Sequence, residues 1–262
     1  MAKPKQIELP DGTIIPILHE DRAVLAIDKP AGWLLAPESC ARTSRNLQLA
    51  LISSIQAGDD WARVRGLKYI RFVHRLDADT SGVVLFVKHP GAVHAYSRLF
   101  ELRRMVKVYL AVVRGIPRER HWVCRLKLAP DRKEIGRMKV DARRGQEAET
   151  QFHVLQSGPE TALIDARPLT GRTHQIRVHL AESGHPVLGD RLYGPGKEDT
   201  DNAPRAGNHS PMALRAAALN YQDPFQKKPV CIEAPIEEFC RRFGFRVDRS
   251  RSGAERSAAS PR

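Results

Sequence analysis

The feature that most constrains this chain is a polar turn that separates two apolar runs between residues 71 and 88. The two runs, residues 70–73 and 83–87, have the length and composition of strands. The turn contains His74, Arg75, Asp77, Asp79, Thr80, Ser81 and Gly82. A carboxylate beside an arginine at the end of a strand is an arrangement from which binding and catalytic sites are often built.

This turn also allows three simpler interpretations. Asp, Ser, Thr and Gly are ordinary turn formers, so the segment could be a turn and nothing more. A calcium-loop spacing that begins at Asp77 fails at its twelfth position, where Lys88 replaces the required Glu. Asp77 and Asp79 are too close in sequence to form an acid and base pair, and Arg75 favours an ionised acid. A single ionised carboxylate is the better interpretation.

Composition restricts the class of protein. The 262 residues are 42% hydrophobic, which is enough to bury a sizeable core. No run reaches 18 apolar residues and the first residues contain no signal-like segment, so we expect a soluble, cytoplasmic protein and no membrane partner. The four cysteines are scattered without a Cys-x-x-Cys pair, which favours neither a zinc site nor a disulfide framework.

The charge indicates a polyanionic partner. The chain carries 43 Lys and Arg against 30 Asp and Glu, a formal charge of +13. Residues 103–144 hold 14 of the basic side chains and only 4 acidic ones. Within this stretch, residues 131–145 are interpreted as a mobile loop or hairpin whose Arg132, Lys133 and Lys139 contact phosphate. The same charges could instead form an ordinary solvated surface. Charge alone also does not show whether the partner is RNA, DNA or a membrane.

Two further segments carry candidate site residues. Residues 105–113 form a predicted strand with Lys107 and Tyr109 on one face, although Tyr109 could equally be a core aromatic. Residues 170–173 are predicted to open a helix that runs to about residue 182. His174 and Arg177 would share a face of that helix, whereas His174 and His179 are five residues apart, which disfavours a metal pair.

The turn and four other blocks carry a family resemblance. His74-Arg75-Leu76-Asp77 followed by Thr80-Ser81-Gly82 resembles the signature of the RluA-type pseudouridine synthases, which are RNA-modifying enzymes. The other matching blocks, in order, are residues 19–32, 107–115, 170–179 and 184–190. The resemblance covers roughly residues 14–240 and implies an α+β pseudouridine synthase fold. Its sheet would be mixed but largely antiparallel, flanked by helices, with a central active-site cleft.

The resemblance also implies the chemistry and the roles of individual residues. Asp77 would be the essential acid, Tyr109 would stack on the flipped uracil, and Arg177 would pair with the acid. No cofactor and no metal are expected. The RNA contacts that we predict come from His74, Arg75, Lys107, Arg172, His174, Arg132, Lys133 and Lys139.

The domain organisation and partners follow. We expect a loose lead-in at residues 1–12, a catalytic domain at residues 13–248 and a disordered basic tail at residues 249–262. The chain would be a stand-alone, monomeric catalytic domain without the small S4-like domain that precedes it in some relatives. Its partner would be structured ribosomal or transfer RNA. The alternatives are a non-catalytic RNA-binding protein or chaperone on the same scaffold, and a hydrolase that releases uracil.

Overall fold

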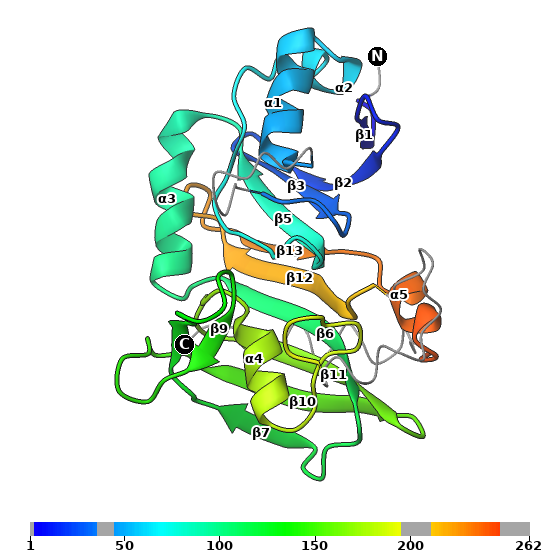
Figure 1. Cartoon of the computed structure of the whole chain (residues 1–262). Helices are drawn as coiled ribbons and strands as arrows, with labels where there is room; N and C mark the ends of the chain where they lie inside the picture. The colour runs from blue at the N-terminus through cyan, green and yellow to red at the C-terminus, as the bar shows by residue number, and fades with distance from the viewer. Residues whose placement is uncertain (1–2, 36–44, 195–210, 247–262) are drawn as a thin grey trace. The chain divides into compact units, whose positions relative to one another are not determined.

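The computed structural model describes residues 3–35, 45–194 and 211–246 (Figure 1). The chain forms two compact units. The first comprises residues 1–106 and 216–234, and the second comprises residues 107–215 and 235–262. The predicted basic tail at residues 249–262 lies outside the described residues.

The first unit is built on a sheet with helices packed against it. Its neighbouring strands follow the order β1, β2, β3, β5, β12, with β13 beside β12 and β4 beside β5. The strands are β1 (Gln6–Glu8), β2 (Ile14–Glu20), β3 (Val24–Lys29), β4 (Arg71–Phe72), β5 (Ser81–Val87), β12 (Leu214–Gln222, in this unit from Ala216) and β13 (Pro229–Glu233). The helices are α1 (Leu47–Ala57), α2 (Asp60–Arg63) and α3 (Pro90–Glu101).

Helix α3 shows how local sequence builds this unit. Pro90 occupies the first turn, where its missing N–H has no intrahelical partner to lose. Ala92, Tyr96 and Leu99 recur at helical spacing and are buried in the core of the unit. The buried Tyr96 hydroxyl donates a 2.6 Å hydrogen bond to Asp223, so the polar end of the ring is satisfied.

The amino-terminal residues differ from the predicted loose lead-in. Strand β1 pairs antiparallel with β2, with Ile7 opposite Ile15, and both side chains are fully buried. Ile7 is buried and its two neighbours are exposed, which is the alternation expected of an edge strand. A strand of three residues is too short for this pattern to be recognised in the sequence.

Gly82 allows β12 to approach the turn that contains Asp77. A Cβ atom at position 82 would lie 2.1 Å from the carbonyl oxygen of Ala216, and the φ angle of Gly82 is +113°. Only glycine therefore fits at this position.

Gly82→Ala is expected to lower the free energy of unfolding by about 3 kcal/mol or more, because backbone strain and overpacking add. Urea denaturation would measure the loss. Gly12→Ala is the matched control, since Gly12 also has a positive φ but nothing within 4 Å of its added Cβ. Equal losses in the two variants would contradict the steric explanation.

The described residues of the second unit form strands and two helices. Its sheet follows the order β6, β11, β10, β7, and β8 pairs with β9. The strands are β6 (Val106–Arg114, in this unit from Lys107), β7 (His121–Cys124), β8 (Leu128–Pro130), β9 (Met138–Val140), β10 (Thr150–Ser157) and β11 (Thr161–Pro168). The helices are α4 (Gln175–Glu182) and α5 (Glu237–Arg242).

Residues 131–145, interpreted as a mobile loop or hairpin, belong largely to a hairpin with its own small core. Strands β8 and β9 pair antiparallel, with Leu128 opposite Val140. Leu128 packs with Ala148, Val178 and Tyr193, so the base of the hairpin is anchored to α4. We call residues 128–140 the basic hairpin.

The architecture confirms the predicted fold class. Helices and strands are mixed, and every strand pairing with a described register is antiparallel. None of the helices in the described part of the chain has the length and hydrophobicity needed to cross a bilayer.

Candidate active site

The turn between β4 and β5 is fixed through its backbone. The Asp77 carbonyl accepts a hydrogen bond from the Thr80 N–H at 3.2 Å. The next carbonyl, that of Ala78, accepts from the Gly32 N–H and from the Lys29 ammonium, both at 2.8 Å. The half-buried Asp77 side chain is therefore presented by a turn that the segment around residues 29–32 holds in place.

Lys29 is the group that sequence reasoning missed in this unit. It is fully buried, and its Nζ donates to the carbonyls of Pro30, Trp33 and Ala78 at 2.8 to 3.0 Å. Burial lowers the pKa of Lys29 to about 7, while the Asp79 and Asp77 carboxylates act in the opposite direction. Three carbonyl acceptors use all three N–H groups of an ammonium, so this geometry favours the charged form. The sequence contained one indication of this role: Lys29 follows the buried Ile27 by two residues, so both side chains point to the same, inward face of the strand.

Lys29→Met is expected to lower the free energy of unfolding by about 2–4 kcal/mol, because three buried carbonyls lose their donor. Thermal or urea denaturation would measure the change. The control is Lys5→Met, since Lys5 is exposed in the same unit. Wild-type stability in Lys29→Met would show that this ammonium does not hold the turn.

His74 and Arg75 occupy different environments. The His74 Nε2 accepts the Leu85 N–H at 3.0 Å, and the ring stacks on Phe100 with a centroid separation of 4.8 Å. His74 therefore attaches the turn to β5 and α3. Arg75 is exposed. Contacts of either residue with RNA remain predictions.

Tyr109 and α4 lie on the same side of the second sheet. Tyr109 is opposite Ala166, which is opposite Phe152, so these side chains share one face. Thr150 has the same parity as Phe152, and its hydroxyl bonds to His179 Nδ1 of α4 at 2.9 Å. Tyr109 is half-buried on this face.

Lys107 supports the turn before α4. Its ammonium donates to the Thr170 carbonyl at 2.7 Å. The Thr170 hydroxyl in turn accepts the Glu149 N–H and donates to Gln175 Oε1. The predicted contact of Lys107 with RNA remains a prediction. Its hydrogen bond to Thr170 gives Lys107 a role in the fold.

Arg177 forms a buried ion pair that the sequence did not predict. Its Nε and Nη2 donate to the two oxygens of Asp190 at 2.7 and 2.8 Å. Asp190 also accepts the backbone N–H groups of Leu192 and Tyr193. Burial raises the pKa of Asp190, but the Arg177 guanidinium outweighs it, so this pKa lies below its usual range. Asp77 belongs to the other unit, and its pairing with Arg177 remains a prediction.

Helix α4 begins later than predicted. The helix starts at Gln175, and His174 is its N-cap in the left-handed conformation, with φ of +54°. The expected sharing of a helix face by His174 and Arg177 is therefore wrong. The buried His174 ring bonds through Nδ1 to the Tyr193 hydroxyl at 2.8 Å. Arg172 lies before the helix, and its Nε donates to the Glu147 carbonyl.

His179 has a structural environment. Its Nδ1 bonds to Thr150 and its Nε2 to the Leu126 carbonyl at 3.0 Å, so protein groups occupy both ring nitrogens. Burial lowers the pKa of His179, which favours the neutral ring. Within the described ranges, no cluster of three or more His, Cys, Asp or Glu side chains could hold a metal ion.

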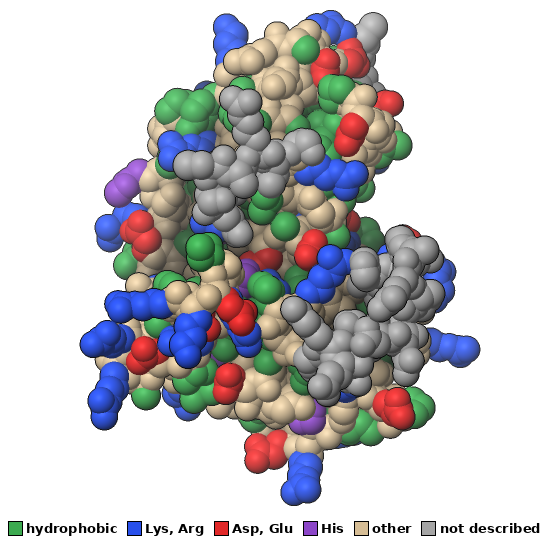
Figure 2. Space-filling view, in the orientation of Figure 1, with side chains coloured by type: hydrophobic (Ala, Val, Ile, Leu, Met, Phe, Trp, Pro, Cys, Tyr) green, Lys and Arg blue, Asp and Glu red, His purple; other side chains and the backbone are tan. Residues whose placement is uncertain are grey.

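The predicted phosphate contacts of the basic hairpin are solvent-accessible. Arg132, Lys133 and Lys139 are all exposed. Among the described residues, the ionic partner of Lys139 is Asp131, at a distance of 3.9 Å. Figure 2 shows Lys and Arg side chains gathered over this hairpin. The hairpin can therefore present positive charge to a polyanion.

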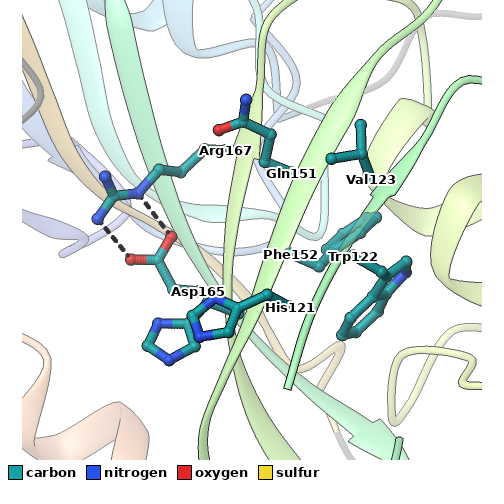
Figure 3. Close-up of a pocket in the computed structure, with 8 residues that line it drawn as sticks. His121, Trp122, Val123, Gln151, Phe152, Asp165 and Arg167 are labelled. Atoms are coloured by element: carbon teal, nitrogen blue, oxygen red, sulfur yellow. Dashed lines mark hydrogen bonds and ion pairs between the residues drawn. The ribbon is translucent and has the colours of Figure 1, made fainter. Parts of the chain in front are cut away.

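A hollow of about 440 Å³ lies on strands β7, β10 and β11 (Figure 3). His121 and His153 stack there at 4.0 Å, and Arg167 donates to both oxygens of Asp165 at 3.0 Å. By strand alternation these four residues point away from the face that carries Tyr109. The hollow is thus separate from the predicted base-binding residues.

Comparison with known proteins decides the family. Residues 23–182 match the family described as RNA pseudouridylate synthase. This chain is a member of that family. The match confirms the resemblance seen in the sequence, and the matched range includes Asp77, Tyr109 and Arg177 but ends before Asp190.

Individual relatives of this chain agree. Ribosomal large subunit pseudouridine synthase C of Vibrio vulnificus is 33% identical over 225 residues, covering 85% of this chain and 66% of the relative. The enzyme of the same name from Escherichia coli K12 is 33% identical over 232 residues, covering 86% and 68%. This chain thus spans about two thirds of the length of these relatives.

A solved structure supports the fold. Human RNA pseudouridylate synthase domain containing 1 is 26% identical to this chain, with a TM-score of 0.65, covering 84% of this chain and 83% of the human one.

Proposed function

We propose that this protein is an RNA pseudouridine synthase that isomerises one or more uridines in structured RNA within the cytoplasm. Ribosomal RNA is the first candidate, because the relatives from V. vulnificus and E. coli are named for the large ribosomal subunit. Transfer RNA is the second. The observation that carries the proposal is the family match over a range that contains Asp77, Tyr109 and Arg177.

The reaction exchanges one bond for another. The bond between ribose C1′ and N1 of uracil breaks, the base turns in place, and C1′ bonds to C5. The proton on C5 is released and N1 gains one, so nothing is oxidised or hydrolysed. The reaction therefore balances without a cofactor. The site must bind the uracil while it is detached from the ribose.

Asp77 is proposed as the group that acts on the sugar or the base, as nucleophile or as general base. A guanidinium close to a carboxylate keeps it ionised in a pocket from which water is excluded, and Arg177 is proposed for this role. The fixed turn around Asp77 and the bidentate Arg177–Asp190 pair support the proposal, because both groups are held rigidly by their own unit.

Access to the target requires that the uridine leave its stack. Flipping a base costs a few kcal/mol, which contacts to the extruded base and its flanking phosphates offset. We propose that Tyr109 stacks on the uracil, that Arg75 fills the gap in the RNA, and that Arg132, Lys133 and Lys139 bind phosphates. The exposure of Arg75 and of the three hairpin cations supports these roles.

Tritium release tests the proposed function. Large-subunit ribosomal RNA and transfer RNA are transcribed with uridine tritiated at C5 and incubated with the full chain. We expect tritium to enter water in proportion to pseudouridine formed, with no free uracil. Free uracil would indicate a hydrolase. Tight RNA binding without tritium release from either RNA would indicate a non-catalytic RNA-binding protein.

A further inference from the structure

Tyr193 lies where three parts of the second unit meet. It follows Asp190 by three residues, and the residue is 9% exposed. It packs with Leu128 at the base of the basic hairpin and with Val178 of α4. One phenol ring thus contacts both the hairpin and the helix that carries Arg177.

The hydroxyl of Tyr193 makes two hydrogen bonds to different elements. It accepts the Met138 N–H of β9 at 2.8 Å, and it bonds to Nδ1 of His174 at 2.8 Å. His174 is the N-cap of α4 in a left-handed conformation that residues with a Cβ rarely adopt. The hydroxyl therefore links the hairpin to the start of the helix.

The ring of Tyr193 contacts two guanidinium groups. Arg137 of the hairpin lies 5.5 Å from the ring centroid, and Arg177 lies 5.1 Å from it. Both distances suit a cation–π interaction. The backbone N–H of Tyr193 also donates to Asp190, the ionic partner of Arg177. Ring and backbone together restrict where the Arg177 side chain can lie.

We infer that Tyr193 is a positioning residue that couples the basic hairpin to Arg177. Binding of RNA phosphates by the hairpin would then reinforce the placement of Arg177 that the reaction needs. The inference rests on the proposed function. An ordinary core position would be filled as well by Phe, because a buried hydroxyl costs free energy unless it is hydrogen-bonded. Here the bonds of the hydroxyl to Met138 and His174 go to the elements that the inference connects.

Two variants separate the hydroxyl from the ring. Tyr193→Phe removes both hydroxyl bonds but retains the stacking on Arg177, so KM for ribosomal RNA is expected to rise roughly 5- to 20-fold with kcat within about twofold. Tyr193→Leu also removes the ring, so kcat is expected to fall in addition by roughly 10- to 100-fold. Rates are measured by tritium release and divided by the folded fraction from circular dichroism.

Tyr221→Phe is the matched control. Tyr221 is buried in the first unit, and no residue in the described ranges partners its hydroxyl. Its removal is expected to leave KM and kcat unchanged. If Tyr193→Phe also leaves KM unchanged, or if both Tyr193 variants alter only the melting temperature, Tyr193 is merely a packing residue and the inference is overturned.

RNA binding distinguishes failure of the inference from failure of the proposed function. The Kd of labelled ribosomal RNA is measured by filter binding for the wild type and Tyr193→Phe. Weaker binding by Tyr193→Phe would support the link between Tyr193 and the hairpin even if the wild type released no tritium. Tritium release by the wild type with equal binding and equal KM in the variant would overturn the inference and leave the function intact.

Discussion

Asp77→Asn is expected to reduce tritium release from C5-labelled uridine RNA by at least about a thousandfold, because the amide can act neither as nucleophile nor as base. RNA affinity should change little, since Asn has the same shape and the proposed phosphate contacts lie elsewhere. Filter binding with the same RNA measures this second quantity.

Asp79→Asn provides the control for Asp77→Asn. Asp79 lies in the same turn, is exposed, and has no proposed part in the reaction. Its turnover should remain within a few-fold of the wild type, as for most surface substitutions away from a site. Substantial turnover in Asp77→Asn would remove Asp77 from the mechanism, whereas equal loss in both variants would point to general damage of the turn.

Arg177→Met is expected to lower the free energy of unfolding by about 3–5 kcal/mol, because it leaves the buried Asp190 carboxylate without its cation. Turnover should also be lost, since the proposed partner of Asp77 is gone. Urea denaturation and tritium release measure the two effects.

The double variant Arg177→Met/Asp190→Asn separates these effects. The amide that replaces the Asp190 carboxylate would be neutral and would keep an oxygen for the N–H groups of Leu192 and Tyr193, so much of the lost stability should return. Turnover should stay low because the guanidinium is still absent. If turnover returned along with stability, Arg177 would have only a structural role.

Local patterns in the sequence were sufficient for much of the fold. The apolar run at residues 83–87 predicted β5, and the strand predicted at residues 105–113 corresponds to β6. Both predictions rest on the composition of a few neighbouring residues. The start of α4 could not be read this way, because the N-cap is a histidine held in a left-handed conformation by a distant tyrosine.

The side chains whose roles the sequence did not reveal act through contacts with residues that are separated from them along the chain. Lys29 reaches Ala78 across 49 positions, and Met138 reaches Tyr193 across 55. Asp190 is closer to Arg177, at 13 positions, but a Gly-Asp turn is common enough to carry no signal of an ion pair. The motifs thus indicated which residues are proposed to act, whereas the groups that hold them in place required coordinates.

The central claim is that this chain forms pseudouridine in cellular RNA through Asp77, and mapping pseudouridine in cells tests it most directly. RNA is compared from cells with the protein, without it, and complemented with the wild type or Asp77→Asn. The account predicts that one or a few discrete pseudouridines disappear without the protein, return with the wild type, and stay absent with Asp77→Asn. Unchanged pseudouridine at every position, or full restoration by Asp77→Asn, would contradict it.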